Sequence, residues 1–217
     1  MARVVFDLDG TLIDSAPDIC GIANMLLARE GAGAITLDEA RSFIGNGAAV
    51  FVARMRAARG IADSEQARLH GDFVAAYDTA VTLTAPYAGV RDALDALVAG
   101  GHALGICTNK PARPARAVLD HLGLTGHFGV ILGGDSLPVH KPEPAPLHAA
   151  FAALGDGPMI YVGDSEVDAE TARRAGVPFL LFTEGYRKTP VDQMYHTRAF
   201  SDFNALPGLV ADLLRAS

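Results

Sequence analysis

The chain has 217 residues, half of them hydrophobic, and a formal net charge of −7 from 25 acidic and 18 basic residues. This length suffices for one large core, or for a core domain with a smaller insertion. The sequence has no basic stripe of the kind that nucleic-acid binders carry, and no apolar run approaches the roughly 20 residues that span a bilayer. We therefore expect neither nucleic acid nor a membrane as a partner.

The N-terminal residues and the cysteines indicate the compartment. Asp7 and Asp9 interrupt the first apolar run too early for a signal peptide. Cys20 and Cys107 are far apart and lack CxxC spacing, so we expect reduced thiols rather than a disulfide or a zinc site. A cytoplasmic protein is expected, and its state as a monomer or a homodimer stays open.

Short apolar runs recur along the chain, with helical spacing of apolar residues between them. They predict strands at residues 3–8, 103–107, 129–132, 159–162 and 179–182. Strands that alternate with helices predict an α/β fold with a parallel sheet covered on both faces. A closing helix is predicted at residues 206–215.

Residues 15–84 break this rhythm, because they show helical patterning and no convincing strand. Helices are predicted at residues 16–30, 37–43, 48–59 and 64–81, with a capping box at Thr36–Glu39 and a similar pattern at residues 63–66. We expect a helical domain at 15–84 inserted into a core domain formed by 1–14 and 85–217. An insertion that begins directly after the first strand is well placed to act as a lid.

The first predicted strand ends in two carboxylates, Asp7 and Asp9, which Gly10 follows at once. Strand side chains alternate between faces, so Asp7 and Asp9 project the same way. Two negative charges at a strand tip repel each other unless a cation or a shared proton compensates. The pair suits a divalent metal, and an acyl-phosphate nucleophile beside a proton donor. A surface turn built from Asp and Gly is the alternative.

Polar residues also follow the later strands, at the edge where parallel sheets bind ligands. Thr108 and Asn109 can present a hydroxyl and backbone N–H groups to a phosphate, or cap the helix that follows. Lys141 is held out of a helix by neighbouring prolines and can supply a fixed positive charge, although a lone lysine is usually solvated. Asp164 offers another metal-binding oxygen, with Asp168 four residues later; helix capping explains part of this pattern.

As an ordered set, DxDGT, the strand-end threonine, the isolated lysine and GDSxxD resemble the haloacid dehalogenase (HAD) superfamily of phosphohydrolases, over nearly the whole chain. The resemblance implies a Rossmann-like α/β core (HAD-like) with an inserted helical cap. Residues 41–48 and 163–172 look like the corresponding segments of bacterial phosphoglycolate phosphatases. The implied activity is Mg²⁺-dependent hydrolysis of a small phosphate ester, with 2-phosphoglycolate as the first candidate.

The resemblance also implies roles for the acids. Asp7 attacks the phosphorus and forms an aspartyl-phosphate, while Asp9 protonates the leaving alkoxide and then acts as base on water. Mg²⁺ is bound by the Asp7 carboxylate, the backbone carbonyl of Asp9 and the Asp164 carboxylate. Asp168 orients Lys141 or a metal-bound water.

The phosphoryl oxygens and the rest of the substrate need further contacts. The resemblance implies that Thr108, the Asn109 backbone and Lys141 steady the phosphoryl oxygens. In the predicted helical insertion, Gly45-Asn46-Gly47 precede a helix whose backbone N–H groups could receive the substrate carboxylate, or they form a plain helix–helix turn. Arg41 is a second candidate for that carboxylate, with an exposed helix charge as the alternative. Residues 185–187 are expected at the rim of the pocket.

Several other functions are compatible with parts of the pattern. The chain could hydrolyse a different small ester, such as a sugar phosphate or a nucleotide, or act as a phosphosugar mutase of the same superfamily. A non-catalytic binding protein on this fold is the alternative from another class. Loss of function would be expected to remove Asp7, Asp9, Lys141 or Asp164 first, and all four are present.

Overall fold

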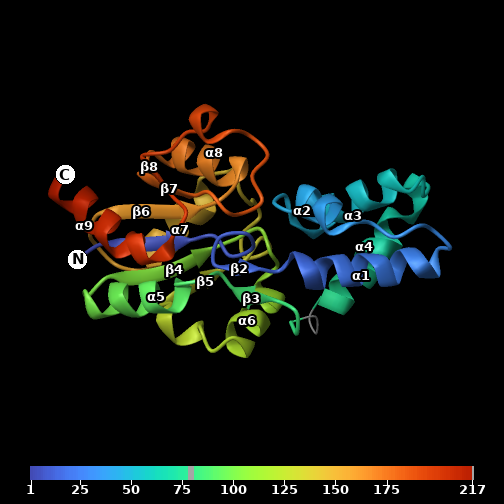
Figure 1. The fold of residues 1–217 in the computed structure, drawn as a ribbon, viewed down its shortest axis with the longest axis horizontal. Coiled ribbons are helices and arrows are strands. Elements are labelled where there is room, and N and C mark those ends of the chain that lie inside the picture. Colours follow the sequence, from blue (N-terminus) through green and yellow to red (C-terminus); the bar gives the residue numbers. More distant parts are fainter. Residues whose placement is uncertain (78–80, 217) are drawn as a thin grey trace.

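The predicted strands form one parallel sheet in the computed structural model, which describes residues 1–77 and 81–216. The sheet order is β5-β4-β1-β6-β7-β8, and every neighbouring pair is parallel (Figure 1). Its strands are β1 (Arg3–Phe6), β4 (Ala103–Cys107), β5 (Val130–Leu132), β6 (Met159–Gly163), β7 (Phe179–Phe182) and β8 (Arg198–Phe200). The α/β fold class predicted from the sequence is therefore confirmed.

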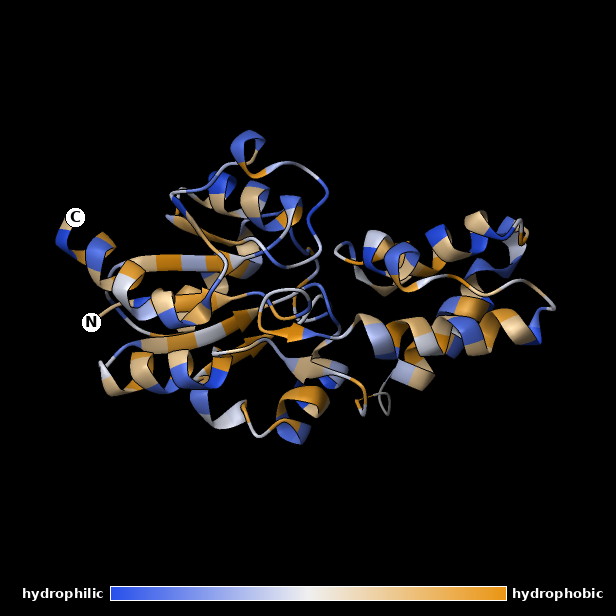
Figure 2. Cartoon of the chain, viewed as in Figure 1, coloured by the Kyte–Doolittle hydropathy of each residue, from blue (hydrophilic) through white to orange (hydrophobic). Residues whose placement is uncertain are grey.

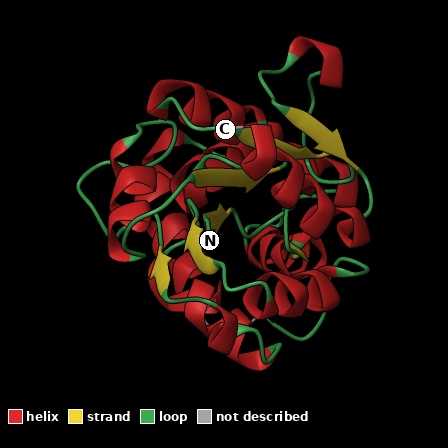
Figure 3. Cartoon of the chain, turned by 90° about the vertical axis from the view of Figure 1, so that its left-hand side faces the viewer, coloured by secondary structure: helices red, strands yellow, loops and turns green. Residues whose placement is uncertain are grey.

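The central strands are largely apolar because both faces of the sheet are buried there. Val4 and Phe6 pack into one hydrophobic cluster, whereas Val5 between them packs into another on the opposite face. Figures 2 and 3 show apolar strands in the interior with helices on both sides. The first cluster receives side chains from α5 (Val90–Ala99), α6 (Ala112–His121) and α9 (Leu206–Ala216), and the second from α7 (Ala145–Ala153) and α8 (Glu166–Ala175).

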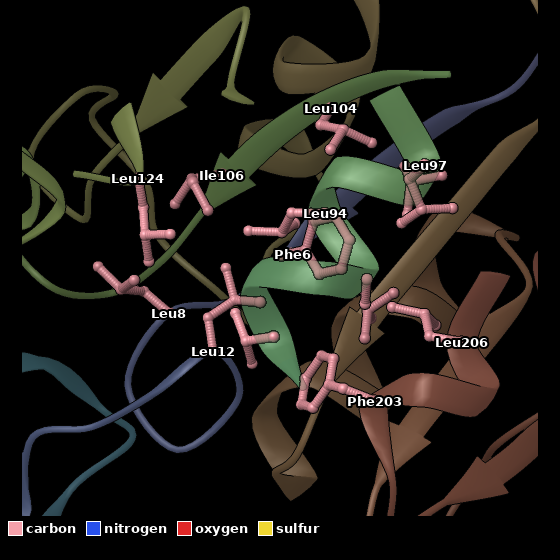
Figure 4. Packing of buried hydrophobic residues seen from close by; sticks show 14 of the residues in the cluster. Phe6, Leu8, Leu12, Leu94, Leu97, Leu104, Ile106, Leu124, Phe203 and Leu206 are labelled. Carbon is pink, nitrogen blue, oxygen red and sulfur yellow. The ribbon is translucent and has the colours of Figure 1, made fainter. Parts of the chain in front are cut away.

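The first cluster is the larger of the two and reaches the end of β1. Leu8 and Leu12, which follow the strand, are fully buried in it with Phe6, as Figure 4 shows. Complete burial of one such side chain contributes roughly 1.5–3 kcal/mol. The loop after β1 is therefore anchored by its apolar residues, which fixes the polar residues that alternate with them.

Helices α1 to α4 lie to one side of this sheet (Figure 1). They are α1 (Ala16–Arg29), α2 (Leu37–Phe43), α3 (Gly47–Ala58) and α4 (Gln66–Tyr77), and they share a hydrophobic cluster of their own. We call residues 16–77 the helical lobe, and residues 1–14 and 85–216 the sheet lobe. In the parts of the chain that the structure describes, no helix combines the length and the apolarity needed to cross a membrane.

The helix ends show which of the predicted capping patterns are present in the structure. The capping box at Thr36 is present, since the Glu39 N–H donates to Thr36 Oγ1 over 3.1 Å and the Thr36 N–H donates to Glu39 Oε2 over 2.8 Å. The similar pattern predicted at residues 63–66 forms a 3₁₀ turn, Asp63–Glu65, without a side-chain cap. Helix α4 begins after that turn and ends at Tyr77, and residues 78–80 of the predicted helix lie outside the described residues. Further 3₁₀ turns are Thr125–His127, Val191–Gln193 and Phe203–Ala205.

The chain leaves and re-enters the sheet lobe through two short strands that pair with each other. The strands β2 (Ile13–Asp14) and β3 (Ala85–Pro86) form a short antiparallel ladder. The Asp18 carboxylate at the start of α1 accepts hydrogen bonds from the Leu83 N–H at 3.0 Å, the Thr84 N–H at 2.7 Å and the Thr84 hydroxyl at 2.7 Å. The described residues at this boundary, 13–18 and 83–86, therefore form one hydrogen-bonded unit, which we call the paired linkers.

Candidate active site

The predicted polar residues meet where the order of strands reverses. The chain runs from β1 to β4 and β5 on one side, and then to β6 on the other side of β1. Asp7, Thr108 and Asp164 directly follow β1, β4 and β6. Parallel sheets bind ligands at such a switch point, beyond the carboxyl ends of the strands. The topology alone therefore gathers these three side chains.

Lys141 is the centre of a buried polar network beside Asp7. Its ammonium lies 2.9 Å from Asp7 Oδ1, and it donates to Asp168 Oδ1 over 2.6 Å and to the Tyr161 hydroxyl over 2.9 Å. The Tyr161 hydroxyl in turn donates to Asp168 Oδ1 over 2.7 Å. Lys141 is 2% exposed, and a buried ammonium is tolerated only when such partners surround it.

The network sets the charge of each acid in it. Burial raises the pKa of Asp7 to about 6, although the Lys141 ammonium opposes this shift. Burial acts in the same direction on Asp168, but Lys141 and hydroxyl donors outweigh it and hold the pKa of Asp168 below its usual value. Asp168 is thus the ionised counter-ion of Lys141. Asp7 has fewer donors to stabilise its negative charge.

Asp164 adds a third buried carboxylate. The Thr11 hydroxyl donates to Asp164 Oδ1 over 2.7 Å and the Tyr186 N–H donates to Oδ2 over 2.6 Å. Burial, followed by the Asp168 and Asp7 carboxylates, raises the pKa of Asp164 well above its usual value. A Cβ at Gly185 would overlap this carboxylate, so the position requires glycine.

The donor set fits a divalent cation. Asp7, Asp164 and Asp168 each offer an oxygen within 4.8 Å of the others. Lys141 contacts two of these three carboxylates and brings a single positive charge. The three carboxylates together, when ionised, carry more negative charge than Lys141 balances. Within the described residues, Asp7 Oδ1 is buried with no aligned hydrogen-bond donor, even though Lys141 lies 2.9 Å away as an ion pair. Hard oxygen ligands with excess negative charge are the donors that Mg²⁺ prefers.

Asp9 occupies a different environment from Asp7. The Ser15 hydroxyl donates to Asp9 Oδ1 over 2.6 Å, and the Lys110 ammonium lies 3.2 Å from the same oxygen. Lys110 also donates to the Tyr77 hydroxyl over 2.5 Å and lies 3.8 Å from the centre of its ring. Burial lowers the pKa of Lys110, and Asp9 opposes that shift. The two aspartates of the first motif therefore have separate lysine partners.

Two pockets open beside these residues, and Asp7 and Asp9 line both. The larger, of about 430 Å³, lies between the lobes and has Thr108 and Lys110 on the sheet-lobe side. Its opposite wall comes from the helical lobe and is largely apolar: Ile19, Ile44, Ala48, Phe51 and Phe73. The smaller, of about 370 Å³, reaches Asp164, Glu166 and Tyr186.

The remaining predicted site residues divide into those at the pockets and those away from them. Gly45 and Gly47 line the larger pocket and Asn46 lines the smaller one. The Asn109 side chain joins the lobes, because its amide donates to the Gly45 carbonyl over 3.1 Å and to the Lys141 carbonyl over 3.0 Å. Arg41 lines neither pocket; its guanidinium lies 3.0 Å from Asp14 Oδ2, and its side chain is 39% exposed.

Three contributors were not identified from the sequence. Tyr161 lies within an apolar strand and reads as a core residue, Thr11 reads as part of a turn, and Lys110 reads as the start of a helix. Tyr161 alternates with Ile160 and Val162, so strand periodicity places it on the face of Asp7. That alternation is the one local signal that could have identified it.

Residues 4–182 match the model of the haloacid dehalogenase-like hydrolase family. The chain belongs to the haloacid dehalogenase-like hydrolases. It is 51% identical to a phosphoglycolate phosphatase of Cereibacter sphaeroides, over 99% of this chain and all of the relative, and 45% identical to one of Rhodobacter capsulatus, over 95% of each. A crystal structure of a predicted phosphoglycolate phosphatase from Haemophilus somnus is similar with a TM-score of 0.89 and 31% identity, covering 96% of this chain and 97% of that one. The family that the motifs resemble is thereby confirmed, and with it the classification of this hydrolase as an enzyme.

Proposed function

We propose that this hydrolase is a Mg²⁺-dependent phosphatase that converts 2-phosphoglycolate to glycolate and phosphate through an aspartyl-phosphate on Asp7. The observation that carries the proposal is the buried Asp7 carboxylate, which faces the pocket beside Asp9 and has an oxygen with no aligned donor. The names of the relatives at 51% and 45% identity support the choice of substrate.

In the first half of the reaction, Asp7 acts as the nucleophile. Its carboxylate oxygen bonds to phosphorus while the bond from phosphorus to the ester oxygen breaks, and the electron pair leaves with that oxygen. Asp9, in its acid form, gives its proton to the leaving oxygen. Lys141, 2.9 Å from Asp7, reduces the repulsion between the attacking carboxylate and an anionic phosphate. Thr108 and the Asn109 backbone steady the phosphoryl oxygens.

In the second half, water replaces Asp7 on phosphorus. Asp9 now accepts a proton from the attacking water, and the bond between phosphorus and the Asp7 oxygen breaks, which regenerates both carboxyl groups. Mg²⁺, held by the Asp7 and Asp164 carboxylates and the Asp9 backbone carbonyl, would supply positive charge at the phosphoryl group when bound. Thr11 and the Tyr186 backbone hold Asp164, and Asp168 holds Lys141.

We further propose that residues 15–84 act as a cap over the core formed by 1–14 and 85–217. The apolar side chains that the helical lobe presents to the larger pocket would exclude water from the first half of the reaction. The Asn109 side chain, which donates to Gly45 of the helical lobe and to the Lys141 carbonyl, would hold the cap at the site.

Phosphate release tests this proposal. Wild-type protein is assayed with 2-phosphoglycolate, glucose 6-phosphate and a nucleoside monophosphate, with Mg²⁺ and with EDTA. We expect 2-phosphoglycolate to be the best substrate, EDTA to abolish turnover, and Asp7→Asn to lower kcat by roughly 10³-fold or more. Asp92→Asn makes the same chemical change at an exposed position of α5 and serves as the matched control.

Three results would count against the proposal. Full activity of Asp7→Asn would exclude the covalent mechanism. Equal turnover of all three esters would exclude the specificity for 2-phosphoglycolate. A sugar phosphate isomer formed without release of inorganic phosphate would indicate a mutase instead.

A further inference from the structure

The larger pocket contains a positive charge that the proposed reaction does not use. Lys110 follows β4, and its side chain is only 3% exposed. Lys141 already accompanies the nucleophile, and neither half of the reaction requires a second lysine. Among the lining residues of the larger pocket that the structure describes, Lys110 is the one that carries a positive charge. Burying an ammonium is unfavourable, so we looked for a function that the buried Lys110 side chain could serve.

The surroundings of Lys110 suit the binding of an anion. An ammonium has three donor hydrogens. Lys110 contacts both oxygens of the Asp9 carboxylate, at 3.2 and 3.4 Å, and donates to the Tyr77 hydroxyl over 2.5 Å, so an incoming carboxylate would share the ammonium with Asp9. The apolar wall from Phe51 and Phe73 lies across the same pocket. Attraction between opposite charges is stronger in such a medium than in water.

The position of Lys110 matches one particular part of a substrate. In the proposed reaction Asp9 contacts the ester oxygen that leaves, so the rest of the leaving group starts beside Asp9. In 2-phosphoglycolate the carbon of a carboxylate lies two bonds beyond that oxygen. The Lys110 ammonium lies 3.2 Å from Asp9 Oδ1, on the wall of the same pocket. A carboxylate on the leaving group therefore arrives within reach of Lys110.

The two candidates that the sequence offered for this carboxylate are less suited. Arg41 lines neither pocket and already has a carboxylate partner in Asp14. Gly45 and Gly47 do line the larger pocket, but the Gly45 carbonyl accepts a hydrogen bond from Asn109, and neither residue brings a charge. Lys110 combines charge, burial and position, which neither alternative does.

We propose that Lys110 is a specificity-determining residue that binds a carboxylate on the leaving group, and thereby selects 2-phosphoglycolate over esters with a neutral leaving group. The inference rests on the proposed phosphatase function. Tyr77 of the helical lobe contacts Lys110 through both its hydroxyl and its ring. The carboxylate subsite is therefore complete only when the helical lobe lies against the sheet lobe, which couples substrate selection to that arrangement.

Steady-state kinetics on two matched esters test the role of Lys110. The first is 2-phosphoglycolate, and the second is 2-hydroxyethyl phosphate, in which a hydroxymethyl group replaces the carboxylate. We expect wild-type protein to favour 2-phosphoglycolate in kcat/KM. Lys110→Met should reduce that preference about 10- to 100-fold, mainly through a higher KM for 2-phosphoglycolate, because one charge-assisted hydrogen bond contributes this much.

Three further variants separate this role from others. Lys110→Arg keeps the charge and should retain part of the preference for 2-phosphoglycolate. Circular dichroism shows whether Lys110→Met is folded, and Lys110→Arg tests the role of the charge if it is not. Tyr77→Phe keeps the ring and removes the hydroxyl, so it should weaken the preference less than Lys110→Met does. Arg41→Met is the matched cation-removal control, and the ratio of the two kcat/KM values should stay as in the wild type.

The outcomes distinguish the two proposals. Equal losses on both esters in Lys110→Met would mean that Lys110 serves Asp9 alone, and would overturn the inference. A collapse of the preference in Arg41→Met, or a wild type that hydrolyses both esters equally well, would also overturn it while leaving the phosphatase intact. Wild-type protein that hydrolyses neither ester would refute the proposed function itself, and the inference with it.

Discussion

Replacing Tyr161 with phenylalanine removes one oxygen from the centre of the site and leaves the ring in place. That hydroxyl accepts from Lys141 over 2.9 Å and donates to Asp168 over 2.7 Å. A hydrogen bond to a charged group contributes roughly 1.5–3 kcal/mol. Lys141 keeps Asp7 and Asp168, and Asp168 keeps the Ser165 hydroxyl at 2.6 Å, so neither charge is left without partners.

Because burial of the hydroxyl itself is also relieved, the net loss should be smaller than two full hydrogen bonds. We expect Tyr161→Phe to lower the free energy of unfolding by about 1.5–3 kcal/mol, which corresponds to a fall in Tm of roughly 4–10 °C for a chain of this size. Lys141 loses one of the contacts that fix it against Asp7. The kcat for 2-phosphoglycolate should therefore fall about 3- to 30-fold, with a smaller change in KM.

Urea and thermal unfolding followed by circular dichroism measure the first effect, and phosphate release measures the second. Tyr195→Phe is the matched control, because Tyr195 is 42% exposed. Surface substitutions of this kind change stability by about 0.5 kcal/mol or less. If the two variants lost the same stability, the Lys141 network would not be what holds the site together.

Further predictions concern the core, a glycine and a thiol. Leu8→Ala should lower the free energy of unfolding by about 2–5 kcal/mol in urea titrations, whereas Leu83→Ala, at a position 62% exposed, should change it little. Gly185→Ala should weaken Mg²⁺ binding, measured by calorimetry, since its Cβ would overlap the carboxylate proposed as a ligand; Gly208→Ala, with open space around it, should not. Burial raises the pKa of Cys107 to about 12, so the reactive thiolate is scarce at pH 8, and intact-mass analysis should show no more than one alkylated cysteine in the folded protein.

The parallel sheet could be predicted because its strands are buried on both faces and read as unbroken apolar runs. Strand β8 (Arg198–Phe200) could not, since it is three residues long and two of them are exposed at the edge of the sheet. Strands β2 and β3 have only two residues each, so their sequences show no alternation of apolar and polar residues that could predict them. Local periodicity needs more residues than these elements contain.

The site divides along similar lines. Asp7, Asp164 and Thr108 directly follow apolar strands, so their position at one sheet edge followed from the strands themselves. Lys110 could not be assigned, because its partners Asp9 and Tyr77 are 101 and 33 residues away. The packing of the lobes brings these partners together, and a single sequence contains no local pattern for that packing.

The paired linkers between the lobes have a mechanical consequence. A ladder of two short strands can bend out of its plane without losing its hydrogen bonds. Sliding one strand along the other would break all of these bonds at once. The Asp18 carboxylate adds three bonds to the second linker, at Leu83 and Thr84. Rotation of the helical lobe would therefore follow a single hinge axis without a change of register. If the proposed cap rotates about this ladder, Tyr77 returns to the same place beside Lys110 and Asp9, a contact far along the chain from the ladder.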